Sequence, residues 1–438
     1  MIKVKNVTQL TYLYLSLFLT TTVIGSLLLY LPVTGKKPIS LIDAFFVASS
    51  AFTVTGLSTV DVPKQFNALG ETIIMLLIQI GGIGIVTLSI FVLILSRKKI
   101  TYNERSLLMI TWNSDKNASL LKLTIQMITF AFGVEFLGFL MLNLVFIPDY
   151  GLARGSFISL FTSVSAFNNA GFSLFSDNLM SYSGNPMINI IVPALIILGG
   201  IGYIVILDVI KTRKITKLKL HTKIVLVSTF TLIVGGTIAF WLLEYHHVLK
   251  GSSVHEQLFK SFFQSVSTRT AGFNSVDMSK ITNPTILVFI VLMFIGAAPM
   301  SSAGGIKVTT FTVILVYIYS RMMGIEHPQI FKRSLLKHQV NNAILIFVLG
   351  MFSIGIATFI ITIAEPHIPF IKLLFEVVSA FGTVGLSTGI TADLSTISKI
   401  VIICVMILGK VGLFILLSIF QAPKVESSYY YAKEEIQM

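Results

Sequence analysis

A short pattern with a central glycine occurs four times in this chain of 438 residues. The four copies read FTVTGL (52–57), FNNAGF (167–172), TRTAGF (268–273) and FGTVGL (381–386). Their glycines stand 115, 101 and 113 residues apart, and each copy lies between two long apolar runs. Non-helical backbone at membrane depth is tolerated only where it lines a cavity or is buried in protein. The recurrence therefore predicts a pore built from four loops of one chain.

The composition is that of a membrane protein. The chain is 54% hydrophobic and 12% charged, with a mean hydropathy of +0.88, whereas a soluble domain carries about 25% charged residues. Each of eight apolar runs exceeds the roughly 20 residues that a membrane-spanning helix needs. These runs are 10–32, 68–96, 123–147, 186–210, 224–246, 284–320, 340–364 and 397–420. The first run ends without a small-residue cleavage site, so we predict a retained helix rather than a signal peptide.

The eight runs group into four repeats of about 100 residues. Between the two runs of each pair lies a short amphipathic stretch followed by the glycine loop, at 40–57, 155–172, 256–273 and 369–386. We therefore predict an all-α membrane protein with four repeats of helix, re-entrant pore helix with loop, and helix, around a central pore. The predicted units are 1–96, 97–220, 221–338 and 339–420, followed by a tail at 421–438.

Charge predicts the orientation. The linkers 97–122, 211–223 and 321–338 hold sixteen Lys or Arg residues, and the much longer pore regions hold ten. The positive-inside rule puts these linkers and both termini in the cytoplasm and the glycine loops outside. The net charge of +13 then reflects topology and attraction to anionic membrane lipid, and no nucleic acid partner is predicted.

The four loops have the chemistry of an ion-selectivity filter. A dehydrating cation needs oxygen ligands, which backbone carbonyls supply when the chain turns them toward an axis. Glycine permits the positive φ angles of such a turn and adds no side chain to the bore. The predicted ion-binding residues are Thr53, Val54, Thr55, Gly56, Asn168, Asn169, Ala170, Gly171, Arg269, Thr270, Ala271, Gly272, Gly382, Thr383, Val384 and Gly385. The alternative, ordinary turn glycines, explains one copy better than four.

Acidic residues follow the loops. Asp61, Asp177 and Asp277 come at nearly constant distance after three of the glycines, and Asp393 comes somewhat later in the fourth copy. A ring of carboxylates at an outer mouth would concentrate cations. The same residues could equally cap a helix or solubilise a turn, and the sequence leaves both readings open.

A second repeated signal lies 24 to 28 residues after each pore glycine. It reads GGIG at 81–84 and 199–202, GAAP at 296–299 and GKVG at 409–412. In the first two copies the small residues are read as helix-packing positions. The third continues as GAAPMSSAGG to residue 305, where a proline and three glycines predict a broken helix. A loop at that point could act as a gate beneath the filter, or be a static kink.

Lys410 is a costly side chain, since lysine at the centre of a span costs about 3 kcal/mol on insertion scales. We predict that it faces the interior, where it pairs with carbonyls of the 296–305 loop or forms an electrostatic barrier. The predicted gate comprises Gly296, Pro299, Ser301, Ser302, Gly304, Gly305 and Lys410. Glu376, in the fourth pore helix, is a candidate partner for Arg269 behind the filter.

The four loops, and the segment GIKVTTF at 305–311 after the broken helix, resemble the Trk/Ktr/HKT superfamily of cation transporters over residues 10 to 420. Within this superfamily, the lack of an extra N-terminal helix pair in this sequence points to the KtrB-type membrane subunit of bacterial Ktr systems rather than to TrkH. The resemblance implies a bacterial cell membrane and potassium as the transported ion, often with sodium dependence, with sodium as a second candidate ion. It also implies a homodimer and a cytoplasmic nucleotide-binding regulatory subunit of the KtrA/KtrC kind, acting in trans.

By position, the resemblance makes Gly56, Gly171, Gly272 and Gly385 the filter glycines, 296–305 the intramembrane gate and Lys410 the basic residue below the filter. The chain itself contains neither a Gly-x-Gly-x-x-Gly fingerprint nor a P-loop, so nucleotide control is assigned to that separate subunit. The basic linkers and the tail are candidate docking surfaces.

Two other classes of function, a secondary transporter and a membrane enzyme, would each leave features that can be sought in the sequence. A secondary transporter with broken helices would show inverted repeats, whereas these four repeats share one orientation. A membrane enzyme would need paired acids, a metal-ligating cluster or an activated nucleophile. The seven histidines lie near span ends or in loops, and Cys404 is the one cysteine. We therefore predict no enzymatic activity, no metal site beyond the transported ions and no bound cofactor.

Overall fold

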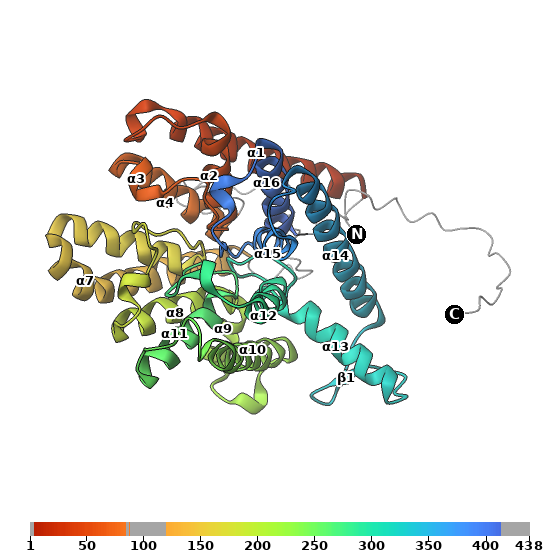
Figure 1. Ribbon diagram of the computed structural model, residues 1–438. Coiled ribbons are helices and arrows are strands. Elements are labelled where there is room, and N and C mark those ends of the chain that lie inside the picture. Colours follow the sequence, from red (N-terminus) through yellow and green to blue (C-terminus); the bar gives the residue numbers. More distant parts are fainter. Residues whose placement is uncertain (1–3, 85–86, 88–119, 413–438) are drawn as a thin grey trace.

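The computed structural model describes residues 4–84, 87 and 120–412. Within that part the chain is almost entirely helical (Figure 1). The α-helices are α1 (Val4–Tyr30), α2 (Leu41–Thr53), α3 (Val62–Gln65), α4 (Ala68–Ile83), α7 (Leu120–Phe167), α8 (Pro186–Gly200), α9 (Tyr203–Thr212), α10 (Leu220–Glu244), α11 (Val254–Ser267), α12 (Asn283–Phe294), α13 (Val308–Met322), α14 (Lys337–Ala364), α15 (Phe370–Phe381) and α16 (Thr396–Val411). Short 3-10 turns are η1 (Pro32–Thr34), η2 (Met180–Tyr182), η3 (Ile215–Lys217), η4 (Met278–Lys280) and η5 (Thr391–Asp393). Linker residues 97–119 and the tail 421–438, both candidate docking surfaces, lie outside the described residues.

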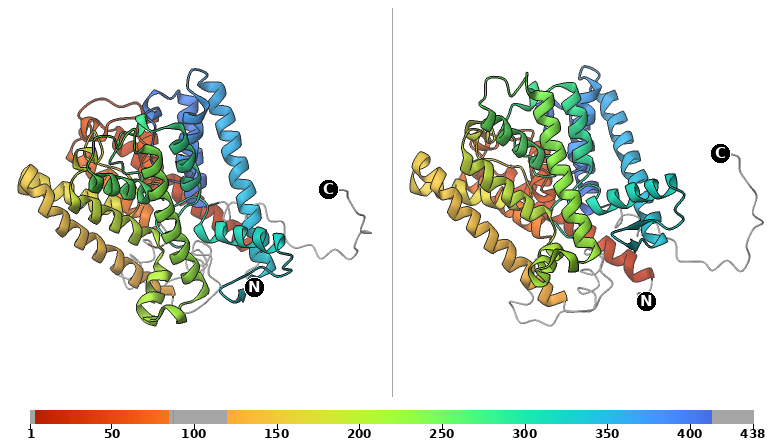
Figure 2. Two further views of the ribbon diagram at one scale, coloured as in Figure 1. Left: turned by 60° about the horizontal axis from the view of Figure 1, so that its bottom comes forward. Right: turned by 90° about the horizontal axis from the view of Figure 1, so that it is seen from below.

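Three described helices are individually long and apolar enough to cross a membrane: Leu123–Phe167 within α7, Leu220–Glu244 and Lys337–Ala364. The pair α8 and α9 makes a fourth span if the two are counted together. Figure 2 shows two of these long helices, α10 in green and α14 in light blue. The elements fall into four groups in chain order, one for each glycine loop, and α10 and α14 belong to the third and fourth. Helix α7 contains both a span and the short helix before the second loop, because Gly151 bends the chain between them with φ 76°.

A short buried helix precedes each glycine loop, and local sequence explains where it starts. The Oγ atom of Ser40 accepts a hydrogen bond from the backbone N–H of Asp43 at the start of α2. Ser253 and Glu256 form a capping box at the start of α11, which satisfies backbone donors that a helix leaves unpaired in its first turn. Helix α2 becomes wholly buried toward its end, so the loop that follows begins inside the protein.

Within the described residues the second apolar run is interrupted in the second and third groups, and a helix ends at the same motif in the first and last, whereas the sequence predicted a break only in the third. Helices α8 and α9 bend by 95° at Gly202, whose φ is 87°. Helices α4 and α16 end at Gly84 and Gly412, with φ of 90° and 84°. The packing reading of the two GGIG copies holds for Gly81 and Gly199, where a Cβ would lie 1.8 Å from the carbonyl oxygens of Phe52 and Phe167. It missed the helix end at Gly84 and the bend at Gly202. The last glycine of each motif adopts a backbone conformation that L-residues rarely reach and that ends a helix.

The third interruption is the longest and is confirmed as a break. Helix α12 ends at Phe294 and α13 begins at Val308, and the residues between them form no helix. Ile295 and Ile306 pair as a short parallel bridge, so the segment leaves and returns at one place. Two strands, β1 (Gln329–Ile330) and β2 (Arg333–Ser334), then form a small antiparallel hairpin after α13. The sequence reading treated 321–338 as a plain linker and missed that hairpin.

The groups of elements follow one another around a common centre, as the colours of Figure 1 show. One apolar cluster joins α1, α2, α4, α7 and α8, and a second joins α10, α12, α14, α15 and α16. The last group returns to the first, where α16 packs on α2. Lys399 of α16 and Asp43 of α2 form an ion pair of 2.8 Å across this junction. Arg154 and the fully buried Glu71 form another, of 2.6 Å, between the first two groups.

Candidate functional site

The four pattern glycines meet in a closed ring of backbone. A Cβ atom placed on Gly56 would lie 2.5 Å from the carbonyl oxygen of Ala170, and one on Gly171 would lie 2.7 Å from that of Ala271. In the same way Gly272 abuts the carbonyl oxygen of Val384, and Gly385 abuts that of Thr55. Each glycine thus faces the residue before the next glycine, and the order closes from the fourth loop back to the first. Only glycine leaves room for this approach.

All four glycines have positive φ, of 95°, 69°, 76° and 92° in chain order, as the filter hypothesis requires. A second left-handed residue stands two positions earlier in every loop, which the sequence did not reveal. These residues are Val54, Asn169, Thr270 and Thr383, with φ of 52°, 56°, 67° and 48°. A β-branched residue with such a φ is an outlier. Strain of this kind persists where surrounding structure holds it, and it concentrates at functional sites.

Backbone N–H groups of the loops point back to the ends of the short helices. The N–H groups of Thr55, Ala170, Ala271 and Val384 donate to the carbonyl oxygens of Ser50, Ser165, Ser267 and Ser379, at 2.8, 2.8, 3.0 and 2.8 Å. Within the part of the chain that the structure describes, the carbonyl oxygens of those same four loop residues accept no hydrogen bond. Four unpaired carbonyl oxygens therefore lie at the ring.

The same four serines also use their hydroxyl groups to brace the loops. The Oγ atoms of Ser50 and Ser379 accept from the N–H groups of Gly56 and Gly385, at 3.0 and 3.1 Å. Those of Ser165 and Ser267 donate instead to the carbonyl oxygens of Phe172 and Phe273. Sequence reasoning missed this set. The available signal was a serine five or six residues before each glycine.

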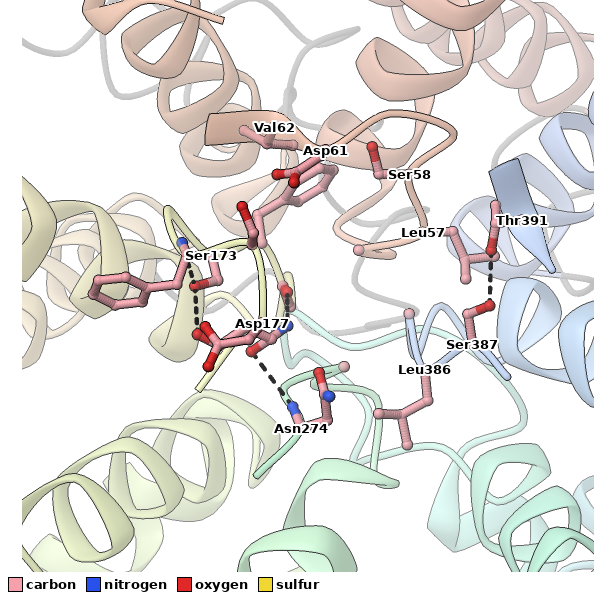
Figure 3. A pocket seen from close by; sticks show the side chains of 18 of the residues that line it. Leu57, Ser58, Asp61, Val62, Ser173, Asp177, Asn274, Leu386, Ser387 and Thr391 are labelled. Atoms are coloured by element: carbon pink, nitrogen blue, oxygen red, sulfur yellow. Dashed lines mark hydrogen bonds between the residues drawn. The ribbon is translucent and has the colours of Figure 1, made fainter. Parts of the chain in front are cut away.

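On one side of the ring lies a cavity of about 340 Å³, here called the outer cavity, whose lining includes all four glycines. Figure 3 shows side chains of every loop facing it: Ser58 and Asp61 from the first, Asp177 from the second, Asn274 from the third, Ser387 and Thr391 from the fourth. The predicted acidic ring forms only in part, because Asp61 and Asp177 line this cavity and Asp277 and Asp393 do not.

The acids also make the bonds that the capping alternative predicted. Asp177 accepts from the N–H of Ser181 at 2.8 Å, and Asp277 accepts from the N–H of Ser279 at 3.0 Å. Hydrogen bonds from Ser279 and Lys280 hold the pKa of the Asp277 carboxyl below its ordinary value. Both readings of these residues therefore hold in part.

A second cavity, of about 180 Å³ and here called the inner cavity, lies on the other side of the loops. It is lined by Gly81, Gly82 and Gly84 of the first group, Gly409, Lys410 and Gly412 of the last, and Met300, Ser301, Ala303 and Lys307 of the interrupted segment. The segment 296–305 thus stands at the inner face of the ring. The N–H of Gly304 donates to the hydroxyl of Thr383 in the fourth loop at 2.9 Å, which links it directly to the ring.

Lys410 reaches this segment. Its Nζ atom donates to the carbonyl oxygen of Ser302 at 2.5 Å, which is one of the two arrangements that the sequence left open. The hydroxyl of Ser302 in turn lies 3.4 Å from the carbonyl oxygens of Phe167 and Gly199. The carbonyl oxygen of Pro299 packs against Gly202 at the bend of α8 and α9. A Cβ atom placed on Gly202 would lie 2.5 Å from this oxygen. The segment is therefore held from three sides.

Arg269 and Glu376 do not pair, contrary to the sequence-based suggestion. The guanidinium of Arg269 is buried and donates to the carbonyl oxygen of Thr229, at 3.4 Å. Glu376 instead accepts from the hydroxyl of Thr391 beside the outer cavity. Arg269 points away from the ring, toward α8 and α10. As a filter residue it can thus contribute backbone only.

The chain resembles transport proteins over nearly its whole length. A family model described as "TrkH: Cation transport protein" matches residues 13–430. The Ktr system potassium uptake protein B of Bacillus subtilis (strain 168) is 41% identical over 413 residues, covering 94% of this chain and 92% of its own length. The protein of the same name from Vibrio alginolyticus is 39% identical over 399 residues, covering 90% and 88%. The potassium/sodium uptake protein NtpJ of Enterococcus hirae is 35% identical over 430 residues, covering 96% and 95%.

The fold also matches a solved structure. The crystal structure of the potassium transporter TrkH from Vibrio parahaemolyticus aligns with a TM-score of 0.75, covering 93% of this chain and 83% of that one. At 18% sequence identity this likeness speaks for the fold alone. The family assignment rests on the matched model and on the sequence relatives, and it is one of transporters rather than enzymes. The chain belongs to the TrkH family of cation transport proteins.

Proposed function

We propose that this chain carries potassium ions into the cell as the membrane subunit of a Ktr-type uptake system. The ring of four unpaired carbonyl oxygens between two cavities is the observation that carries the proposal. Carbonyl rings replace the hydration shell of a potassium ion in selective pores. Two relatives at 41% and 39% identity are named as Ktr potassium uptake proteins, which supports the same ion.

In the proposed pathway, a hydrated cation enters the outer cavity and loses water as it meets the carbonyl oxygens of Thr55, Ala170, Ala271 and Val384. The short helices α2, α11 and α15 end at the loops, so their partly negative C-termini favour a cation there. The serine hydroxyls hold the loops from behind, and their rigidity keeps the oxygens from collapsing onto a smaller ion. The backbone of the sixteen predicted filter residues, rather than their side chains, does the selecting.

The proposed architecture is four repeats around this pathway, with units 1–96, 97–220, 221–338 and 339–420. Each repeat contributes two spans and one re-entrant loop, eight spans in all, with a bend in the second span of the second repeat and a break in that of the third. The agreement of element order in all four groups supports this division. We place the basic linkers and both termini in the cytoplasm on the charge distribution, with the glycine loops on the outer side.

We further propose that segment 296–305 is the gate and that Lys410 holds it in place. The segment lies at the inner face of the ring, and it touches the fourth loop, the α8–α9 bend and Lys410. Removal of this segment from the inner cavity would open a path for the ion. The lysine charge, placed at the same cavity, opposes a cation that waits there.

The proposed assembly is a homodimer with a cytoplasmic nucleotide-binding subunit of the KtrA/KtrC kind. Support comes from relatives that are named as proteins of Ktr systems and from the lack of nucleotide-binding motifs in this sequence. Attraction of the basic linkers to anionic lipid would place the docking side at the inner membrane surface.

Uptake of tracer rubidium into proteoliposomes of the purified chain tests the function, with potassium and sodium as competitors. If potassium inhibits rubidium uptake at a concentration far below the sodium concentration that gives the same inhibition, the result supports a potassium pathway. Equal competition supports the alternative, a less selective pathway, to which the name of the NtpJ relative points. Absence of flux both in this chain and in a variant lacking part of 296–305 contradicts the proposal.

A further inference from the structure

A buried carboxylate behind the second loop has no part in the function proposed so far. Glu135 lies in α7 and is 3% exposed. Its two carboxylate oxygens accept from Nε2 of Gln79, at 3.0 and 2.9 Å. One of them also accepts from Nδ2 of Asn168 at 2.9 Å. Three elements therefore converge on this side chain: α4 of the first group, α7, and the loop that carries Gly171.

The donors show that this carboxylate is an anchor rather than a cation site. Amide N–H groups face Glu135, and within the described residues no lysine, arginine or histidine forms an ion pair with it. The buried Glu71, by contrast, binds Arg154 at 2.6 Å. Both carboxyl oxygens are engaged by amide donors at 2.9 to 3.0 Å, so Glu135 holds the amide of Asn168 in one place.

Asn168 is well placed to transmit this hold to the ring. It stands three residues before Gly171 and directly before the left-handed Asn169. Asn168 also packs closely against Gly82 of α4. A Cβ atom on Gly82 would overlap the Asn168 amide, so a larger residue does not fit there. Oε1 of Gln79 and the carbonyl oxygen of Val164 also lie within hydrogen-bond distance of Nδ2 of Asn168, at 3.1 and 2.9 Å, so three acceptors share its two hydrogens.

The matching positions in the other loops are held differently. The hydroxyl of Thr53 donates to the carbonyl oxygen of Ser49 in its own helix, at 2.7 Å. Arg269 reaches the carbonyl oxygen of Thr229, and Gly382 has no side chain. Among the described residues, Asn168 is thus the only one of the four that is tied to a carboxylate. The second loop thus adds a carboxyl-anchored side-chain network to a bond with its own helix, whereas Thr53 bonds its own helix and Arg269 the backbone of a span.

We propose that Glu135 is a positioning residue that fixes the second filter loop through Asn168 and thereby helps to set the preference among monovalent cations. The inference rests on the proposed function, because it assumes that the ring is the filter. Loss of the anchor frees the Asn168 amide and the peptide that follows it. The carbonyl oxygen of Ala170, two residues on, then loses its fixed distance from Gly56 across the ring.

The first test is Glu135→Gln, which keeps the shape of the side chain but replaces one carboxyl oxygen by an NH2 group and so turns one acceptor into a donor. We expect the ratio of the sodium to the potassium concentration that halves rubidium uptake to fall about tenfold, equivalent to roughly 1.4 kcal/mol. Asn168→Ala should lower the ratio similarly. The double variant should lower it no further, because both changes break one linkage.

Glu244→Gln is the matched control. Glu244 is a fully buried carboxylate as well, but it accepts from the N–H of Thr282 and the hydroxyl of Thr285, near the start of α12. It touches no loop of the ring within its described contacts. A general loss of packing would lower the amount of folded protein in both variants, whereas the concentration ratio should change only in Glu135→Gln.

A swap of the two partners gives a sharper test that does not depend on a folded single variant. Gln79→Glu combined with Glu135→Gln keeps one carboxylate and one amide between α4 and α7, and Asn168 can still donate to both. We expect the swap to recover most of the wild-type ratio. A wild-type ratio in Glu135→Gln, an equal change in Glu244→Gln or no recovery in the swap would each overturn the inference. Absence of rubidium uptake by the wild-type chain and its gate variant would instead contradict the proposed function.

Discussion

Substitution of Gly171 by alanine adds the smallest possible side chain to the ring. The Cβ atom would lie 2.7 Å from the carbonyl oxygen of Ala271 and 2.9 Å from the Cα atom of Gly272. That oxygen would have to retreat to at least 3.0 Å, and it reaches ordinary contact only at 3.4 Å. An alanine at φ 69° also costs roughly 1–2 kcal/mol of backbone strain. The carbonyl ring must therefore either open or tilt.

A shift of this size acts on ion preference more than on folding. Carbonyl oxygens displaced by several tenths of an ångström no longer match a potassium ion, so we expect the potassium preference over sodium to fall about tenfold to a hundredfold, or roughly 1.4–2.8 kcal/mol. The assay is rubidium uptake into proteoliposomes, with potassium and sodium as competitors over a wide range of concentrations.

Gly151→Ala separates the contact from the backbone strain. Gly151 has φ 76°, close to that of Gly171, but a Cβ there meets nothing within 4 Å. Its substitution should therefore lower stability and leave ion preference at the wild-type value. Unchanged preference in a folded Gly171→Ala protein, or an equal change in both variants, would refute the assignment of the ring as the filter.

Deletion of residues 301–303 should raise rubidium flux several-fold without changing ion preference, because it shortens the segment that fills the inner cavity; lower flux in folded protein would make that segment structural. Lys410→Met should raise flux less, since it removes only the bond to Ser302 and one charge. Ser379→Ala should reduce ion preference a few-fold by removing the acceptor of the Gly385 N–H, whereas Ser353→Ala, whose hydroxyl bonds its own helix, should have no effect. Lys399→Gln should lower the melting temperature in detergent by a few degrees, because loss of a half-buried pair costs roughly 1–2 kcal/mol, while Lys64→Gln at the exposed Asp61 pair should change it little.

The glycine ring was predictable because glycine alone meets its steric requirement. A Cβ at any of the four ring positions would overlap a carbonyl oxygen, so these positions must be glycine. The sequence therefore shows the ring as four glycines in matching places: Gly56, Gly171, Gly272 and Gly385. The second left-handed position leaves no such trace. Val54 and Thr383 adopt it under the constraint of surrounding structure, and their residue types favour extended backbone.

The bend between α8 and α9, and the helix ends at Gly84 and Gly412, were missed for a related reason. Small residues such as Gly81 and Gly202 serve two purposes, close packing and helix termination, and the sequence does not separate them. In the third repeat a proline settled the choice. Three-dimensional pairing was the least predictable element, because the partners of Glu135 and Glu376, which are Asn168 and Thr391, come from later segments of the chain. The Arg269–Glu376 pair failed because proximity in repeat position is not proximity of side chains.

The four residues that stand three positions before the ring glycines are Thr53, Asn168, Arg269 and Gly382, and they share neither size nor charge. In a pore made of four identical subunits, every substitution enters the ring four times at once. Here a single substitution alters one quarter of the ring and leaves three quarters intact. On the proposed function, ion preference therefore changes in small, separable steps, and the contribution of each quadrant can be measured on its own within one folded chain.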